Sequence, residues 1–174
     1  MPRLFLTGFM AAGKSAVGPR AAHALGYAVV DLDREIEHQA GRPIPQIFAD
    51  DGEAAFRDLE AAALATAATR ENCVIITGGG CVIRADNRRL MARSGHVVCL
   101  WATPHAIVRR TRRGRTGRPL LDGAKAPLEH VTAMLAEREA FYRECHHIVD
   151  TTGRTVEAVT AEVVRLHREG AWKR

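Results

Sequence analysis

The chain has 174 residues, of which 47% are hydrophobic and 26% are charged, a balance typical of one soluble globular domain with a substantial core. No uninterrupted apolar run approaches the roughly 18 residues that a membrane-spanning helix needs, and the first residues lack the layout of a signal peptide. These features predict a cytoplasmic protein, and the net charge of +5 with a pI near 9.4 favours an anionic ligand, either a nucleotide or a nucleic acid.

The cysteines do not predict a disulfide framework or a zinc site. They lie far apart and form no C-x-x-C pair: Cys73, Cys81, Cys99 and Cys145. The segment Cys145-His146-His147 lacks a second pair of ligands, so we expect structural roles for these side chains.

Five short apolar runs alternate with helix-length segments rich in Ala, Leu, Arg and Glu. The runs are Leu4–Thr7, Tyr27–Leu32, Cys73–Thr77, His96–Trp101 and His146–Asp150. This alternation predicts an α/β fold, with a parallel sheet covered by helices on both faces. No repeat or linker divides the chain, so we expect a single domain over residues 1–174.

The segment Gly8-Phe9-Met10-Ala11-Ala12-Gly13-Lys14-Ser15 follows the first run and precedes a predicted helix, which is the arrangement of a phosphate-binding P-loop. Gly8 and Gly13 allow successive backbone amides to point into one concavity, and the helix amino terminus adds to the attraction for phosphate. Lys14 can reach the outer phosphates, and the Ser15 hydroxyl can bind Mg²⁺. A glycine-bearing turn with a surface lysine is the alternative, and the complete motif in its context argues against it.

The second run ends in Val29-Val30-Asp31-Leu32-Asp33. Because side chains two apart project from the same face of a strand, we expect both carboxylates in the crevice at the carboxyl edge of the sheet. Asp31 suits the Mg²⁺ shell through water, and Asp33 suits contact with an acceptor hydroxyl. The alternative is a solvated strand end, with Asp33 capping the following helix.

A helix is predicted from Gly52 to Thr69, with Phe56, Leu59 and Ala63 on one side. Arg57 and Glu60 are three residues apart and can pair on an adjacent face. From the residues alone, we expect this pair to lie on the surface.

The third run leads into Gly78-Gly79-Gly80, and Thr77 stands where many P-loop ATPases carry an Asp for Mg²⁺. Three glycines in a row let a ligand approach the backbone and use its amides as donors. We favour this interpretation over a flexible turn, because each glycine costs chain entropy.

A helix predicted from Pro104 ends in an arginine-rich segment with six arginines in ten residues: Arg109, Arg110, Arg112, Arg113, Arg115 and Arg118. Residues 112–126 show no apolar period and are longer than most connections, which predicts a mobile lid. The arginines suit a solvated face, a nucleic-acid patch or a phosphate clamp.

The helix predicted from Pro127 to about Cys145 carries an inward stripe of Leu128, Val131, Leu135 and Tyr142. Arg138 occupies the remaining position of that stripe, and an inward arginine needs an anionic partner. Neighbouring glutamates project elsewhere, so a bound carboxylate would meet this need. The alternative is that Arg138 extends to the helix edge and solvent.

With these motifs in this order, the chain resembles the shikimate kinases along nearly its whole length. The resemblance is carried by Gly-Phe-Met-x-Ala-Gly-Lys-Ser, Asp31-x-Asp33, Phe56-Arg57-x-x-Glu60, Gly78-Gly79-Gly80, Arg118-Pro119-Leu120-Leu121 and Arg138-x-x-x-Tyr142. It implies a three-layer P-loop fold like that of nucleoside monophosphate kinases, with a five-stranded parallel sheet, a lid and substrate-binding helices at about residues 33–61. It also implies transfer of the ATP γ-phosphate to the 3-hydroxyl of shikimate, with Mg²⁺.

The resemblance implies a role for each matching residue. Asp33 would bind ring hydroxyls and assist removal of the acceptor proton. Arg57, oriented by Glu60, would hold the substrate carboxylate together with Arg138. The remaining implied contacts are Gly79 and Gly80 with the ring; Ala11, Ala12, Gly13, Lys14, Ser15, Ala16, Arg110, Arg118 and Arg154 with the nucleotide; and Ser15 and Asp31 with Mg²⁺. Of these, Lys14 and Arg118 would act on the transferring phosphate, and Arg110 would lie against the adenine.

The chain departs from the family pattern at a few positions. Ala11 stands where Gly is usual, Ala16 where a hydroxyl residue is usual, and Leu32 where Ser or Thr is frequent. The lid is about one residue longer. None of these changes removes a residue with an assigned role, so an active enzyme is expected.

Other functions remain open from the sequence. Gluconate kinases share the P-loop and the general size, but the glycine triplet and two arginines suited to a carboxylate favour shikimate. A non-catalytic nucleotide-binding module or a basic nucleic-acid binder is also compatible, although the arginine-rich segment has no interleaved aromatic residues for base stacking. We expect a monomer with small-molecule substrates and with no nucleic-acid or membrane partner.

Overall fold

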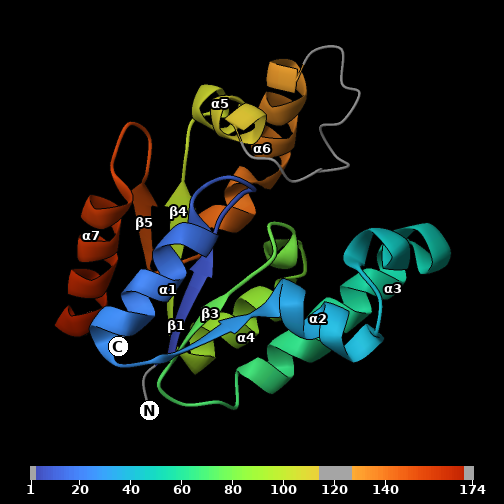
Figure 1. Ribbon diagram of the computed structural model, residues 1–174, viewed down its shortest axis with the longest axis horizontal. Coiled ribbons are helices and arrows are strands. Elements are labelled where there is room, and N and C mark those ends of the chain that lie inside the picture. Colours follow the sequence, from blue (N-terminus) through green and yellow to red (C-terminus); the bar gives the residue numbers. More distant parts are fainter. Residues whose placement is uncertain (1–2, 114–126, 171–174) are drawn as a thin grey trace.

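The computed structural model describes residues 3–113 and 127–170. It contains a five-stranded, entirely parallel sheet in the order β2-β3-β1-β4-β5 (Figure 1). The strands are β1 Arg3–Thr7, β2 Ala28–Asp31, β3 Cys73–Ile76, β4 His96–Trp101 and β5 His147–Asp150. All five predicted runs are strands, and the predicted α/β class is confirmed.

Helices cover both faces of the sheet (Figure 1). They are α1 Lys14–Leu25, α2 Leu32–Ala40, α3 Ile44–Ala67, α4 Ala85–Ser94, α5 Pro104–Arg113, α6 Pro127–Arg143 and α7 Val156–Glu169, with the short 3₁₀ helix η1 Cys81–Ile83. None of these described helices is both long and apolar enough to cross a membrane.

The alternation of side chains along β1 shows how the two layers share the sheet. Leu4 and Leu6 pack in one core with Val17 of α1 and Val163 of α7. Phe5, between them, belongs to the opposite core, which includes residues of α3, α4, α5 and α6. Because both faces are covered, the carboxyl edge of the sheet is where a ligand can reach the strand ends.

Two predicted elements need correction. Asp33 does not extend β2, because helix α2 begins at Leu32, immediately after the strand. Helix α3 begins at Ile44 rather than Gly52, and Gly52 has a non-helical backbone (φ 82°, ψ 175°) that divides it into two helical parts. Glycine tolerates this positive φ, so the kink falls at the one position nearby that accepts it without steric cost.

The predicted lid falls almost entirely outside the described residues. Residues 112 and 113 are the last two of α5, so they belong to a helix. Residues 114–126, which include Arg115 and Arg118, are not described.

Four histidines meet at the amino ends of β4 and β5, at the opposite edge of the sheet from the P-loop. His96 is fully buried, and its Nδ1 lies 3.2 Å from Nδ1 of His167, while its Nε2 lies 2.8 Å from Nδ1 of His147. His146 Nδ1 accepts a hydrogen bond from the Val97 amide at 3.0 Å. Burial, and then the neighbouring histidines, lower the pKa of His96 to about 3. The predicted structural role for His146 and His147 agrees with these contacts.

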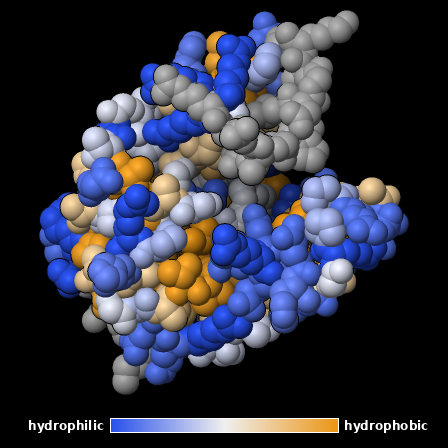
Figure 2. Space-filling view, in the orientation of Figure 1, coloured by the Kyte–Doolittle hydropathy of each residue, from blue (hydrophilic) through white to orange (hydrophobic). Residues whose placement is uncertain are grey.

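The face of the molecule shown in Figure 2 is largely hydrophilic, with an apolar patch over β2. Val29 of this edge strand is 44% exposed.

All four cysteines are free thiols.

Candidate active site

The P-loop connects β1 to α1 with glycines at the positions where the backbone requires them. Gly8 has φ 134°, and a Cβ there would collide with the Leu100 carbonyl oxygen. Gly13 has φ 111° and immediately precedes α1. Ala11 also has a positive φ of 57°, although it carries a side chain. The loop therefore holds its amides at the amino terminus of α1, which favours anion binding.

Lys14 is buried and tied to the loop that it follows. Its Nζ donates hydrogen bonds to the carbonyl oxygens of Gly8 at 2.6 Å and Phe9 at 3.0 Å. These bonds hold the ammonium group on the concave side of the loop, next to the cavity described below.

A cavity of about 400 Å³ lies over the P-loop. Its wall includes Met10, Ala11, Gly13, Lys14, Ser15, Ala16, Asp31, Asp33, Ile76, Thr77, Gly79 and Arg110. The cavity thus combines loop amides, an ammonium group, a hydroxyl and two carboxylates, which suits a polyphosphate and a cation.

Arg110 holds the P-loop against the segment that follows β5. Its Nη1 donates to the carbonyl oxygen of Ala11 at 3.1 Å and to Oγ1 of Thr151 at 2.9 Å, and its Nη2 donates to the Thr151 carbonyl oxygen at 2.6 Å. Arg154 is not among the described residues lining the cavity; it pairs with Glu162 at 2.6 Å. Ala12 is fully buried beneath the loop and also does not line the cavity.

A second cavity, of about 510 Å³, adjoins the first and shares Met10, Asp33 and Gly79 with it. Its wall is apolar over Phe9, Ile44, Pro45, Phe48 and Phe56. It also contains the charged residues Asp33, Glu53, Arg57, Glu60 and Arg138. An apolar pocket with a few convergent charges is typical of a site for a small polar ring with an anionic group.

Both aspartates line the first cavity, but they do not lie on one face of a strand as predicted. Asp31 ends β2 and caps α2, since its Oδ1 accepts from the amides of Asp33 at 3.1 Å and Arg34 at 3.4 Å. Asp33 lies in the first turn of α2 and is open to both cavities. Desolvation, and then the charge of Asp31, raise the pKa of Asp33, and Lys14 opposes this shift.

Arg57 and Glu60 form a buried pair, so the predicted surface ion pair is wrong. Arg57 Nη1 lies 2.8 Å from Glu60 Oε2, and the side chains are 14% and 1% exposed. Oε1 of Glu60 is buried without a hydrogen-bond partner among the described residues. Burial raises the pKa of Glu60, and Arg57 opposes the shift.

Each glycine of the triplet is contacted by a different part of the site. A Cβ on Gly78 would lie 2.8 Å from Glu60 Oε1 and 2.9 Å from Asp33 Oδ1, and one on Gly80 would lie 2.6 Å from Arg57 Cζ. The equivalent atom on Gly79 would lie 3.3 Å from the Met10 amide nitrogen of the P-loop. The triplet therefore lets both carboxylates, the P-loop and a guanidinium group approach one short segment.

Helix α6 brings Arg138 to the second cavity, which Arg57 also lines. Val131, Leu135 and Tyr142 of the predicted stripe are buried, and the Tyr142 hydroxyl donates to the Gly79 carbonyl oxygen at 2.5 Å. Among residues 3–113 and 127–170, no acidic side chain forms an ion pair with Arg138. The stripe prediction is confirmed for these three residues, Leu128 is half-buried, and the expected ligand of Arg138 stays a prediction.

Sequence reasoning missed Glu53, Phe48 and Met10, all of which line the second cavity. Glu53 accepts hydrogen bonds from Arg57 Nε at 3.2 Å and from Nη2 at 3.1 Å. Its spacing of four residues from Arg57 is a signal that could have revealed it. No local pattern marks Phe48 or Met10.

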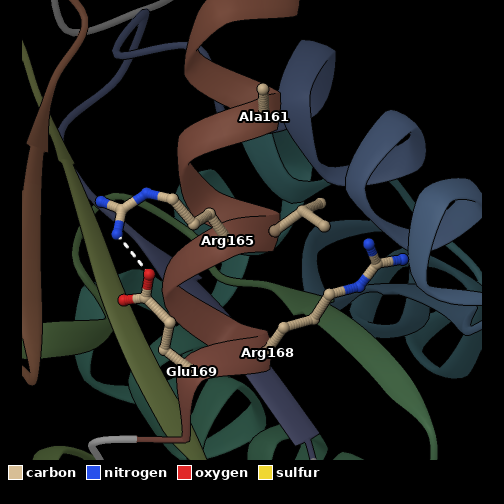
Figure 3. A pocket seen from close by; sticks show the side chains of 5 residues that line it. Ala161, Arg165, Arg168 and Glu169 are labelled. Carbon is tan, nitrogen blue, oxygen red and sulfur yellow. Dashed lines mark hydrogen bonds and ion pairs between the residues drawn. The ribbon is translucent and has the colours of Figure 1, made fainter.

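Another hollow, of about 490 Å³, lies over α7, away from the P-loop (Figure 3). Arg165 and Glu169 pair with each other there at 2.5 Å, and Arg168 turns toward α1 and donates to the Ala24 carbonyl oxygen. Its charged groups thus have partners within the protein. The joined cavities at the strand ends are therefore the candidate active site.

Comparison with known proteins agrees with this geometry. The sequence model of the shikimate kinase family matches residues 10–167. The shikimate kinase of Geobacter metallireducens is 46% identical over 160 residues, covering 92% of this chain and 88% of that protein. The solved structure of the Acinetobacter baumannii shikimate kinase in complex with shikimate is 32% identical, with a TM-score of 0.91 over 98% of this chain and 95% of the other. A gluconokinase from Sinorhizobium meliloti, at 17% identity and a TM-score of 0.58, shares the fold alone. The chain belongs to the shikimate kinase family.

Proposed function

We propose that this enzyme transfers the γ-phosphate of ATP to the 3-hydroxyl of shikimate, giving shikimate 3-phosphate and ADP for the synthesis of aromatic amino acids. The observation that carries the proposal is the pair of adjoining cavities, one built on a P-loop and the other containing two arginines, with Asp33 in the wall common to both. This arrangement supports in-line meeting of a terminal phosphate and an acceptor hydroxyl, because phosphoryl transfer depends mainly on positioning and charge stabilisation.

In the acid-binding cavity, Arg57 and Arg138 hold the substrate carboxylate, and Gly79 and Gly80 contact the ring. Two planar guanidinium groups favour a carboxylate over a neutral polyol, which supports an acidic acceptor. Phe48 and Phe56 supply an apolar surface for the ring.

In the transfer step, the acceptor O–H bond breaks as its oxygen bonds to the γ-phosphorus, and the bond from that phosphorus to the ADP oxygen breaks. Asp33 accepts the acceptor proton, a role supported by its place in both cavity walls and by its raised pKa. Lys14 holds the outer phosphates. Arg118, which lies outside the described residues, is proposed to stabilise the transferring group.

The nucleotide is proposed to lie along the P-loop, contacted by Ala11 to Ala16, with Arg110 and Arg154 nearer its base. The Arg110 hydrogen bonds to Ala11 and Thr151 fix its guanidinium group at the wall of this cavity. Mg²⁺ would supply charge neutralisation of the phosphates. Ser15 and, through water, Asp31 are the residues proposed to hold it, and both line the cavity with oxygen ligands that this hard cation prefers.

The direct test is ADP formation by the purified protein with ATP, Mg²⁺ and shikimate, with gluconate and other polyols as controls. We expect turnover that depends on shikimate. No shikimate-dependent turnover from a folded sample that binds ATP would refute the proposal.

We further propose that the enzyme is a cytoplasmic monomer without a nucleic-acid or membrane partner. Light scattering at micromolar concentration should give the mass of one chain. A salt-dependent gel shift with duplex or single-stranded nucleic acid would contradict this view.

A further inference from the structure

Arg57 is held by two of the protein's own carboxylates. Glu60 Oε2 accepts from Nη1, and Glu53 Oε1 accepts from both Nε and Nη2. A guanidinium group has five N–H donors, so three of them are already committed. The three side chains together carry a net charge of −1, which opposes the approach of another carboxylate.

The two glutamates differ in how easily they can leave Arg57. Glu60 is 1% exposed and lies against Gly78, so moving it into water would require the site to open. Glu53 is 64% exposed and can reach solvent by a change of rotamer. It is also the first residue after the kink at Gly52, near the amino terminus of a helical segment, where a free carboxylate remains favoured.

We propose that Glu53 is an affinity-setting residue: its carboxylate occupies the side face of Arg57 and exchanges with the carboxylate of the acid substrate. This inference rests on the proposed function, because it names Arg57 as a substrate contact. When the acid binds, Glu53 turns to solvent, and Arg57 keeps Glu60 and gains the substrate. The charge around Arg57 is then the same before and after binding, and a neutral ligand cannot replace Glu53 at the guanidinium.

The exchange predicts that removing Glu53 changes the affinity for the acid in the direction opposite to that expected if Glu53 only supported Arg57. If Glu53 only held Arg57 in place, its removal would weaken substrate binding. If it competes, its removal strengthens binding of the acid. Because exposed ion pairs are worth about 0.2–1 kcal/mol, the expected gain is roughly 1.4- to fivefold in affinity.

The experiment compares Glu53→Gln and Glu53→Ala with the parent enzyme. We expect the KM for shikimate to fall roughly 1.4- to fivefold in both, with smaller changes in kcat and in the KM for ATP. The methyl ester of shikimate, which lacks the anionic group, should show no such gain. Thermal melting confirms that each variant is folded.

Asp58→Asn is the matched control. Asp58 lies in the same helix and loses the same charge, but it pairs with Arg84 rather than with Arg57. Its KM for shikimate should stay unchanged, which separates direct exchange from a general change in electrostatic potential.

A second readout does not depend on turnover. Cyclohex-1-enecarboxylate titrated into the parent enzyme should shift the Arg57 Nε–H resonance, and Glu53→Ala should give the shift at lower ligand concentration. If the parent enzyme fails to turn over shikimate but this shift behaves as described, the proposed substrate is wrong and the exchange stands. A KM for shikimate that is unchanged or raised in Glu53→Gln and Glu53→Ala would overturn the exchange.

Discussion

At the scale of single residues, the two arginines of the acid-binding cavity differ in their pairing with the described carboxylates. Arg138 lines the acid-binding cavity and forms no ion pair with the described acidic residues, whereas Arg57 has two. Arg138 is thus the guanidinium that the proposed substrate carboxylate can reach without displacing one of the described carboxylates.

Replacing Arg138 with Ala is expected to raise the KM for shikimate by roughly 10- to 100-fold, the value of a hydrogen bond to a charged group. The KM for ATP should remain nearly unchanged, because Arg138 does not line the nucleotide cavity. Steady-state kinetics with each substrate varied separately measures both. Equal losses for the two substrates would contradict the assignment.

Asp33→Asn keeps the shape of the side chain and removes its basicity. We expect kcat to fall by roughly 10²- to 10⁴-fold, the usual contribution of a general base. The melting temperature should change little, since Asp33 is open to the cavities and α2 is capped by Asp31 instead. A kcat near that of the parent would show that this carboxylate does not take part in proton transfer.

Ala11 has a left-handed backbone (φ 57°) within the P-loop, a conformation that favours glycine. Ala11→Gly should therefore stabilise the fold by about 1 kcal/mol, seen as a higher melting temperature. An unchanged or lower melting temperature would mean that the added chain entropy of glycine outweighs the relieved strain.

At the scale of elements, the glycine triplet after β3 links the two cavities. It contacts the P-loop, α2 and α3, and it accepts a hydrogen bond from Tyr142 of α6. A change in this short segment therefore moves several side chains that belong to different helices.

Gly80→Ala should displace Arg57, because the new Cβ would lie 2.6 Å from Arg57 Cζ. We expect the KM for shikimate to rise at least tenfold with little change in ATP binding measured by calorimetry, since the displaced guanidinium makes charge-assisted contacts worth about 1.5–3 kcal/mol. Gly26→Ala is the control, since its Cβ would meet no neighbour although its φ is 71°. That variant should lose stability without changing the KM, and a similar KM change in both would show that the effect is not local.

The sequence predicted the strands and the P-loop better than it predicted which side chains are buried. All five strands and the P-loop follow from local patterns, because alternation and glycine spacing are properties of neighbouring residues. The burial of the Arg57–Glu60 pair does not, because a three-residue spacing shows that two side chains can meet but not what covers them. Asp33 was misplaced because nothing local showed that a helix would begin at Leu32, directly after a four-residue strand. The histidine cluster joins residues 71 positions apart, beyond any local pattern.

At the scale of the whole molecule, the buried histidines make stability depend on pH. The pKa of His96 is lowered to about 3 in the folded protein, from about 6.5 in an unfolded chain. The unfolded state therefore binds more protons than the folded state between these pH values. The free energy of unfolding is highest above pH 6.5 as far as His96 is concerned, and it falls as the pH decreases below that value.

Between pH 6.5 and pH 5, we expect the free energy of unfolding to fall by about 2 kcal/mol on account of His96. Urea titrations at several pH values measure this slope. His96→Leu should flatten the slope whatever its effect on absolute stability, and the exposed His105→Gln should leave the slope unchanged. A parent protein with no loss of stability over this range would contradict the prediction.

Met10, Asp33 and Gly79 line both cavities and form a partition between the proposed nucleotide site and the proposed acid site. A substitution in this partition changes the walls of both cavities, so it cannot change the affinity for one ligand alone. Substitutions at these three positions should alter the affinities for ATP and shikimate together. Phe48 lines only the second cavity and Arg110 only the first, so substitutions there should alter the affinity for one of the two compounds. Differences in acid preference among related enzymes should therefore accumulate on the outer walls and leave the partition unchanged.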